Sequence, residues 1–222
     1  MSTMHSVTLL AINIAAPRRL DVGGKAVETG IFKSPAARRV AVEPLGIAGD
    51  AVCDLARHGG PDQAIYLYSA EDQAWWARTL QRDIGPGYFG ENLTIDCWWP
   101  SPRVGDRLVF GSVEFEISFP RIPCATLAAR VGDPRFVKRF VAARRPGLYA
   151  RVLHRGEVEV GSRGVVRPAS DHHPTAAELF DCWHSSPRDF ALMRSALQTP
   201  IAERARAGFE HWLCQSHAPN EA

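Results

Sequence analysis

The sequence predicts a mostly β, α+β protein in which a β domain is followed by a small domain of three helices. Glycine and proline punctuate the first two thirds of the chain about every ten residues and separate short runs of β-branched and aromatic residues. After Pro168 this pattern ends. From there on, capping residues precede segments whose apolar residues recur at helical spacing. We therefore expect a β domain over residues 1–168 and a helical domain over residues 169–222.

Short apolar runs predict the strands of the first domain. They cover residues 7–14, 65–68, 93–95 and 148–152. The clearest hairpin covers residues 107–118, where Gly111 and Ser112 form the turn. A second turn, at Arg155 and Gly156, is expected to join strands over residues 149–153 and 157–160, so that β structure continues almost to the end of the domain.

The second strand of the hairpin alternates apolar and polar residues. The apolar set is Val113, Phe115 and Ile117, and the polar set is Glu114, Glu116 and Ser118. Because side chains alternate between the two faces of a strand, we expect the first set in the core and the second in solvent.

Two helices are expected to interrupt the β domain. Ser69 and Asp72 have the spacing of a capping pair, which predicts a helix that continues through Leu80. Asp133 is expected to cap a second helix over residues 136–143, with proline at its first position.

The helical domain begins after a polar linker at residues 169–174. Thr175 and Glu178 form a capping box for its first helix. The dipeptides Ser186-Pro187 and Thr199-Pro200 are expected to open the second and third helices. The domain's own core is expected to contain Phe180, Trp183, Phe209 and Trp212.

The composition is that of a soluble globular protein. Of the 222 residues, 45% are apolar and 23% are charged. The apolar run at residues 7–16 is interrupted by Asn13 and is far shorter than the ~20 residues of a membrane span. The five cysteines form no C-x-x-C pair and follow no secretory signal, which favours free thiols. We expect a cytoplasmic protein with no membrane partner.

Arginine supplies 23 of the 26 basic residues, and residues 121–167 hold eleven basic residues against three acidic ones. Because guanidinium groups bind phosphate through two parallel hydrogen bonds, a phosphate-bearing ligand is one interpretation and a solvated basic face is the other. Few aromatic residues are interleaved with these arginines, so no nucleic-acid polymer is expected as a partner. Motifs for ATP, dinucleotides, serine hydrolysis and zinc proteolysis are absent from the sequence.

Two loops carry residues suited to ligand binding. Arg57 and His58 precede Gly59, Gly60 and a proline, and paired glycines let backbone N–H groups approach a ligand closely, although an ordinary turn has the same pattern. Asn92 directly precedes a predicted strand. Its amide donates and accepts hydrogen bonds, which suits recognition of a heterocycle, and an Asx turn is the alternative.

A third segment, residues 120–124, directly follows the predicted hairpin. Two prolines stiffen it, and Arg121 lies three residues before Cys124. A neighbouring positive charge favours a thiolate, which suits a nucleophile or a soft metal ligand, whereas many cysteines are buried and unreactive.

The order of these segments is more specific than any one of them. The succession is Gly46-Ile47-Ala48-Gly49-Asp50, Arg57-His58-Gly59-Gly60-Pro61-Asp62, Phe89-Gly90-Glu91-Asn92, Pro120-Arg121-Ile122-Pro123-Cys124 and Gly147-Leu148-Tyr149-Ala150-Arg151. It closely resembles the MOSC domain of molybdenum cofactor enzymes and, within that family, the YiiM group. The resemblance covers residues 7–168, and residues 175–213 resemble the three-helix domain that follows in this group.

The resemblance implies an irregular, closed β-barrel that binds the molybdenum cofactor, molybdopterin, with Cys124 as the molybdenum ligand. The implied catalytic residues are Cys124, His58 and Asn92. The implied cofactor-binding residues are Arg57, His58, Gly59, Gly60, Asn92, Arg121, Cys124 and Arg151. The two later arginines are expected to bind the phosphate or the oxyanionic edge of the metal centre. His58 is the expected proton donor, with Glu91 as the alternative.

The resemblance also implies an activity. Members of the group reduce N-hydroxylated compounds such as hydroxylaminopurine bases, which implies N–O bond reduction, a role in detoxification and a separate flavin-type reductase as electron donor. One alternative is a non-catalytic MOSC module that binds or carries the cofactor or its sulfur. Another is a metal-free interaction module that docks through its helical tail.

The sequence departs from the pattern of the group at three places. Gln63 stands where lysine is common, Ile122 where glutamine is common, and Ala125-Thr126 where an aromatic residue and lysine are common. These positions surround the expected pocket, so the changes bear on the substrate and on docking of the reductase more than on cofactor binding.

Overall fold

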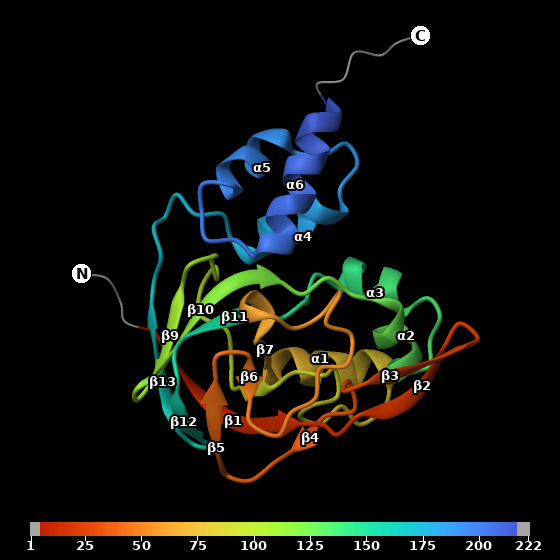
Figure 1. Cartoon of the computed structure of the whole chain (residues 1–222), viewed down its shortest axis with the longest axis vertical. Helices are drawn as coiled ribbons and strands as arrows, with labels where there is room; N and C mark the ends of the chain where they lie inside the picture. The colour runs from red at the N-terminus through yellow and green to blue at the C-terminus, as the bar shows by residue number, and fades with distance from the viewer. Residues whose placement is uncertain (1–4, 217–222) are drawn as a thin grey trace.

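The core of the protein is a closed barrel of seven strands, seen in a computed structural model that describes residues 5–216 (Figure 1). The order around the barrel is β13-β9-β10-β11-β7-β8-β1, and pairing of β1 with β13 closes it. All neighbours are antiparallel except β7 and β8, which are parallel and joined through a helix. The strands are β1 (Ser6–Ile14), β7 (Ile65–Ser69), β8 (Leu93–Ile95), β9 (Arg107–Phe110), β10 (Val113–Pro120), β11 (Leu148–His154) and β13 (Arg163–Arg167).

Alternating apolar residues close the barrel around one core. Inward-facing side chains from every strand are fully buried there, among them Leu9, Ile65, Phe115 and Ile117. The barrel confirms the β fold expected from the sequence, and the β9–β10 hairpin turns where predicted, with Phe110 opposite Val113.

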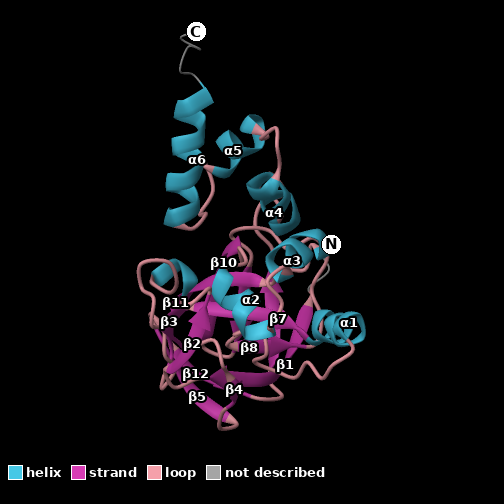
Figure 2. Cartoon of the chain, turned by 90° about the vertical axis from the view of Figure 1, so that its right-hand side faces the viewer, coloured by secondary structure: helices cyan, strands magenta, loops and turns pink. Residues whose placement is uncertain are grey.

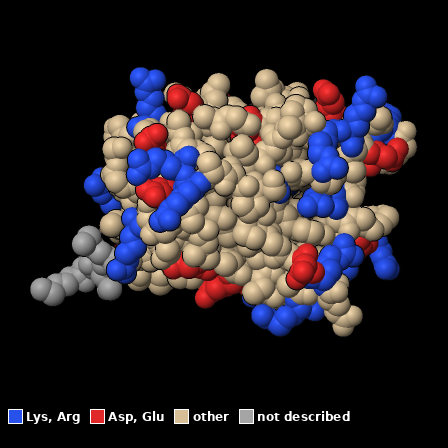
Figure 3. All heavy atoms as spheres, turned by 90° about the horizontal axis from the view of Figure 1, so that it is seen from below, with Lys and Arg blue, Asp and Glu red and all other residues tan. Residues whose placement is uncertain are grey.

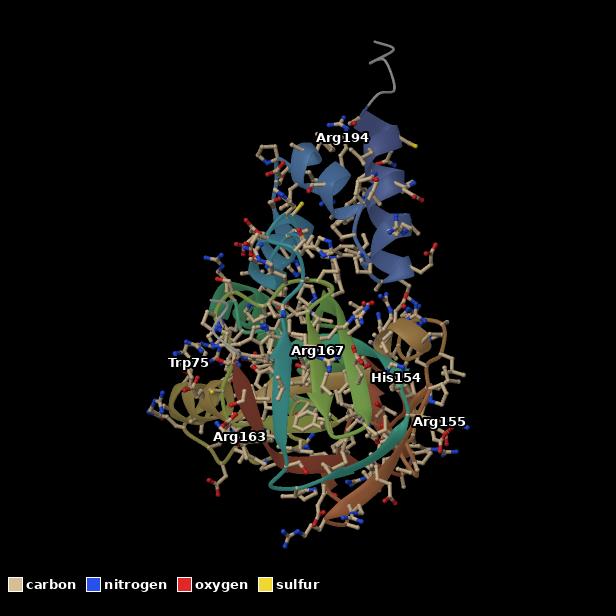
Figure 4. All side chains as sticks on the ribbon, turned by 90° about the vertical axis from the view of Figure 1, so that its left-hand side faces the viewer. Trp75, His154, Arg155, Arg163, Arg167 and Arg194 are labelled. Carbon is tan, nitrogen blue, oxygen red and sulfur yellow. The ribbon has the colours of Figure 1, made fainter. Side chains whose placement is uncertain are left out.

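The outer face of β10 differs from the prediction, because Glu114 is only 5% exposed and Ser118 is fully buried. Arg107 of the neighbouring strand lies 3.2 Å from Glu114, and His154 and Arg167 approach the same carboxylate on the face shown in Figure 4. The Ser118 hydroxyl donates to the Asp62 carbonyl at the other end of the strand. The polar residues of this face predicted that it would be exposed to solvent. Charged neighbours and a loop cover it instead.

Two smaller sheets flank the barrel. A hairpin of β2 (Arg18–Val22) and β3 (Lys25–Thr29) lies at one side, and β4 (Ser34–Pro35) pairs with β1. A three-stranded sheet has the order β12-β5-β6, with β12 (Gly156–Glu159), β5 (Arg39–Glu43) and β6 (Gly46–Ile47). The expected strands on either side of Arg155 are present, and β12 pairs with β5 rather than with β11.

Ion pairs hold this small sheet together. Glu159 of β12 accepts a hydrogen bond of 2.7 Å from Arg39 of β5, and Arg38 lies 3.1 Å from the same carboxylate. Figure 3 shows the face of the molecule opposite the helical domain, where blue and red side chains gather around the rim and the middle is uncharged. Basic residues form no continuous patch on that face.

Three helices cover one side of the barrel (Figure 2): α1 (Ala70–Leu80), α2 (Ala125–Val131) and α3 (Phe136–Ala143). They enclose a second core that includes Trp76, Phe89, Phe136 and Phe140. The Ser69 cap of α1 is confirmed.

The sequence analysis places α3 correctly but names the wrong cap and misses α2. Arg135, not Asp133, is the N-cap residue of α3, and the Asp133 carboxylate accepts from the Arg135 N–H one turn earlier. The N-cap residue of α2 is Cys124, whose side chain makes no capping hydrogen bond. The sequence therefore contains no capping residue that would predict the start of α2.

The C-terminal part contains α4 (Ala176–His184), α5 (Phe190–Ala196) and α6 (Glu203–Ser216). The Thr175–Glu178 capping box is confirmed. The second helix begins later than predicted, because Asp189 caps it, and α6 begins three residues after Pro200. Residues 217–222 of the expected domain lie outside the described residues. No helix within residues 5–216 has the length and apolar character that a membrane crossing requires.

The helical domain shares a core with the barrel. Val104 and Phe119 of the barrel pack with the buried faces of α4, α5 and α6, and the Phe119 ring lies 5.6 Å from Trp183 and 6.1 Å from Phe209. The expected linker is also fixed, because the Ala169 N–H donates to Asp106 at 2.7 Å. The domain border at residue 168 stays a prediction.

Phe119 therefore joins the two parts of the molecule. We expect Phe119→Ala to lower the free energy of unfolding by about 3 kcal/mol, because it leaves a cavity in a packed aromatic cluster. Leu10→Ala is the matched control, since Leu10 is 44% exposed and its loss should cost less than about 0.5 kcal/mol. Urea unfolding measures both, and an equal cost for the two would contradict the shared core.

Candidate functional site

Cys124 lies at the point where the chain leaves β10 and enters α2. Its side chain is partly buried, and the backbone carbonyl of the residue accepts from the Leu127 N–H at 3.1 Å. Two prolines, at 120 and 123, stiffen the connecting segment. The thiol is thus held at the end of a barrel strand by a rigid turn.

The glycine loop brings His58 within hydrogen-bonding reach of this thiol. Gly59 and Gly60 have φ angles of +69° and +79°, which only glycine adopts readily, and a Cβ on Gly59 would meet Val52 at 2.8 Å. The loop then passes into a short 3₁₀ helix, η1 (Pro61–Gln63), and β7. The two glycine N–H groups have no hydrogen-bond partner within the part of the chain that the structure describes.

The surroundings of Cys124 favour its thiolate. Burial opposes ionisation, but a hydrogen bond with His58, the positive charges of Arg121 and His58, and the Leu127 N–H together outweigh it. They lower the pKa of the Cys124 thiol from 9.0 to about 6. Burial instead raises the pKa of Cys53, Cys97 and Cys182, so Cys124 differs from these three.

Arg121 is a buried cation without a carboxylate partner among the described residues, and its side chain is only 4% exposed. One end of its guanidinium donates to the Phe89 carbonyl, and the group lies 4.7 Å above the Tyr66 ring. Its Nε atom is buried and has no hydrogen-bond partner within residues 5–216. An orphaned donor on a buried cation is costly unless an anion or an acceptor meets it.

Asn92 is built into the scaffold at Tyr66, the residue whose ring lies under Arg121. Its amide oxygen accepts from the Tyr66 N–H at 3.1 Å, and its amide nitrogen donates to Asp50 at 2.8 Å. Asp50 also pairs with Lys33, whose pKa burial lowers. Asn92 thereby fastens β8 to β7, and its predicted catalytic role stays a prediction.

Glu91, the alternative proton donor, is fully buried. Its carboxylate accepts from the side chain of Gln73 and from the N–H groups of Gly87 and Phe89, at 3.1 Å for the last. Burial raises the pKa of Glu91 to about 7, although these hydrogen bonds hold it down. The carboxylate therefore anchors the loop that presents the Phe89 carbonyl to Arg121.

Comparison with known proteins identifies the family. The model of the MOSC domain matches residues 54–163, which include the His58 loop, Cys124 and Arg151. The chain is similar to YiiM from Geobacillus stearothermophilus, whose crystal structure superimposes with a TM-score of 0.78 at 26% identity and covers 93% of this chain and 99% of that one. The uncharacterized protein YflK of Bacillus subtilis is 35% identical over 156 residues, 70% of this chain and 71% of that protein.

The chain belongs to the MOSC domain family. Its structural neighbour places it in the YiiM group of that family. A protein named reductase from Gibberella moniliformis is also similar, with 29% identity over 155 residues, which are 68% of this chain and 27% of that protein. MOSC domains are associated with binding of the molybdenum cofactor.

The two remaining predicted arginines of this MOSC protein have protein partners. Arg151 donates to Asp62, Glu116 and the Pro200 carbonyl at 2.7–2.9 Å, so its donors point at the protein rather than at open space. Arg57 is exposed and lies 3.3 Å from Asp54. Their roles in cofactor binding stay predictions.

The MOSC site also contains residues that sequence reasoning missed. Tyr66 and Tyr149 are directly opposite in the β7–β11 register, and their rings lie 5.2 Å apart beside Arg121. The register of β7 and β11 could have revealed these two tyrosines as neighbours. That register depends on the pairing of strands that lie far apart in the sequence.

A second missed group lies at the far end of α2. The guanidinium groups of Arg18 and Arg130 lie over the Phe32 ring at 4.5 and 4.7 Å, and the Arg130 Nε is buried without a partner. Neither arginine pairs with a carboxylate among the described residues. Burial and the charge of Arg18 lower the pKa of Arg130. These two groups are suited to an anion such as phosphate.

A cavity of about 290 Å³ lies elsewhere, between α1, α4 and the start of β11. Its charged groups are already paired, Arg145 with Asp72 and Arg144 with Asp181 outside the cavity lining. None of the predicted site residues lines it. Within residues 5–216 no three His, Cys, Asp or Glu side chains converge as a metal cluster, so Cys124 stands apart from any such set.

The pKa of Cys124 can be checked by alkylation. In the cofactor-free protein we expect iodoacetamide to modify Cys124 with a midpoint near pH 6, because the thiolate is the reactive form and it predominates above the lowered pKa. His58→Gln should raise the midpoint, since it removes the hydrogen bond and the charge. Peptide mass spectrometry against Cys97 as the internal reference measures this, and equal midpoints for the two cysteines would contradict it.

Proposed function

We propose that this protein is a molybdenum cofactor-dependent oxidoreductase that reduces N-hydroxylated compounds, such as hydroxylaminopurine bases, with Cys124 as the molybdenum ligand. The observation that carries the proposal is the Cys124 thiol, whose pKa is lowered to about 6 beside a buried arginine with an unpaired donor. A thiolate is a soft metal ligand, and the lowered pKa of Cys124 makes that form available at neutral pH. The reductase from Gibberella moniliformis supports an oxidoreductase activity.

The residues present fit the cofactor. The orphaned Nε of Arg121 offers a hydrogen bond to an anionic group near the thiolate. The N–H groups of Gly59 and Gly60, which donate to no described residue, offer two more. Arg18 and Arg130, at the other end of α2, are suited to the phosphate. When bound, the cofactor supplies the two electrons that cleave the N–O bond.

The protein's own side chains supply the protons that the reaction consumes. Reduction of an N–OH group to an amine and water consumes two electrons and two protons, so a proton donor is needed beside the metal ligand. His58 contacts Cys124 and has the side chain that exchanges protons most readily near neutral pH. We assign proton delivery to His58 and the supply of electrons to a separate flavin-type reductase.

Metal analysis tests the ligand assignment. We expect the wild type from a cofactor-competent host to carry about one molybdenum and one pterin per chain, and Cys124→Ser to lose the metal, because a hydroxyl is a poor substitute for a thiolate. Cys97→Ser is the matched control and should keep both. A wild type without molybdenum and pterin would remove the proposal and leave the metal-free interaction module.

Turnover tests the proposed reaction and the role of His58. We expect reduction of hydroxylaminopurine with an artificial reductant, and a loss of at least about 100-fold in kcat for His58→Gln with its molybdenum retained. His172→Gln, which changes an exposed histidine of the linker, should have no effect.

Two outcomes would contradict this assignment. A metal-loaded His58→Gln protein with full turnover would eliminate the proton-donor role. A metal-loaded wild type without any turnover would favour the cofactor carrier.

A further inference from the structure

The helical domain contacts the loop that carries His58. Arg204, in the first turn of α6, donates to the Leu55 carbonyl at 2.8 Å and to the Gln63 side chain at 3.3 Å. These two acceptors lie on either side of His58 in the sequence. In Figure 4 the lower end of α6 lies directly above the orange loop segment of the barrel.

A second set of contacts joins strand, loop and helix at one carboxylate. Asp62 accepts from the Glu203 N–H at 2.7 Å with one oxygen and from Arg151 at 2.8 and 2.9 Å with the other. Arg151 in turn donates to the Pro200 carbonyl at 2.9 Å. The end of the loop is therefore tied to β11 and to the start of α6 together.

The rest of the loop has little packing of its own. Leu55 is 67% exposed and Val52 is 38% exposed, and no residue from 51 to 63 belongs to the buried cores formed by the described residues. Inside the loop, the N–H groups of Arg57 and His58 both donate to the Asp54 carbonyl. Such a segment keeps one conformation only if outside contacts hold it.

We propose that Arg204 is a positioning residue, through which the helical domain holds the loop so that His58 stays against Cys124. The proposal rests on the role assigned to His58. It gives the helical domain a part in the reaction, because a general acid contributes fully only when its distance to the reacting atoms is fixed. Arg204 itself touches no reacting group.

Gln63 strengthens this inference. The side-chain oxygen of Gln63 accepts from Arg204 at 3.3 Å, whereas a lysine at this position would have no acceptor and would carry a like charge. The contact between the loop and α6 therefore depends on the amide of Gln63.

The test uses the full-length protein with four variants. Arg204→Ala removes both contacts, and Arg204→Lys keeps a donor for the Leu55 carbonyl. Gln63→Lys replaces the acceptor for Arg204 with a second positive charge. Arg194→Ala is the matched control, because Arg194 is an exposed arginine of the same domain, labelled in Figure 4, and donates to the Phe190 carbonyl of its own helix.

We expect Arg204→Ala to speed amide hydrogen exchange in residues 54–60 and to shift the imidazole NMR signal of His58. With metal-loaded protein, kcat should fall about tenfold at unchanged KM and unchanged molybdenum content. Arg204→Lys should keep most of the wild-type kcat, and Gln63→Lys should lose part of it. Arg194→Ala should have the kcat of the wild type.

Wild-type exchange and an unmoved His58 signal in Arg204→Ala would overturn the proposal, and so would a loosened loop with full kcat. If the wild type shows no turnover at all, the proposed function fails. The exchange and NMR results then still decide whether α6 positions the His58 loop.

Discussion

Burial of the Arg121 charge is the constraint on which the site depends. The fold places this guanidinium at the end of β10 with 4% of its side chain exposed, gives it a carbonyl and an aromatic face, and leaves one of its donors without a partner. Taking a cation out of water without an anion is unfavourable by several kcal/mol. The Cys124 thiolate, which a hydrogen bond with His58 and the charge of Arg121 both favour, compensates for part of that cost.

The same constraint orders the neighbouring loops. The Phe89 carbonyl faces Arg121 because Glu91 gathers the backbone N–H groups around it, and Asn92 ties the next strand to β7. Each polar group is buried and has partners in other segments, so the site is assembled by long-range contacts rather than by one motif. The scaffold role of Asn92 follows from these contacts.

Local patterns were sufficient to predict most of the elements. Short apolar runs located β1, β7 and β8, a turn followed by apolar alternation located the β9–β10 hairpin, and the Thr175–Glu178 box located α4. The sequence did not predict the features that depend on contacts between residues far apart in the chain. The polar face of β10 is covered by arginines from other strands, and β12 pairs with β5 across more than a hundred residues. Cys124 and Arg121 were found from their spacing, but the engagement of Arg151 with Asp62 and Pro200 depends on the helical domain.

The contacts between α6 and the His58 loop have a consequence for the order of folding. Glu203 and Asp62 are 141 positions apart, as are Arg204 and Gln63. Contacts at such separation form late, because a long loop of chain must be closed before they contribute free energy. On the ribosome, the loop is made well before the residues that fix it. The strands of the barrel, which end at Arg167, also precede α6 in the chain, so a His58 loop that α6 holds would take its place only after the last helix has been made and docks.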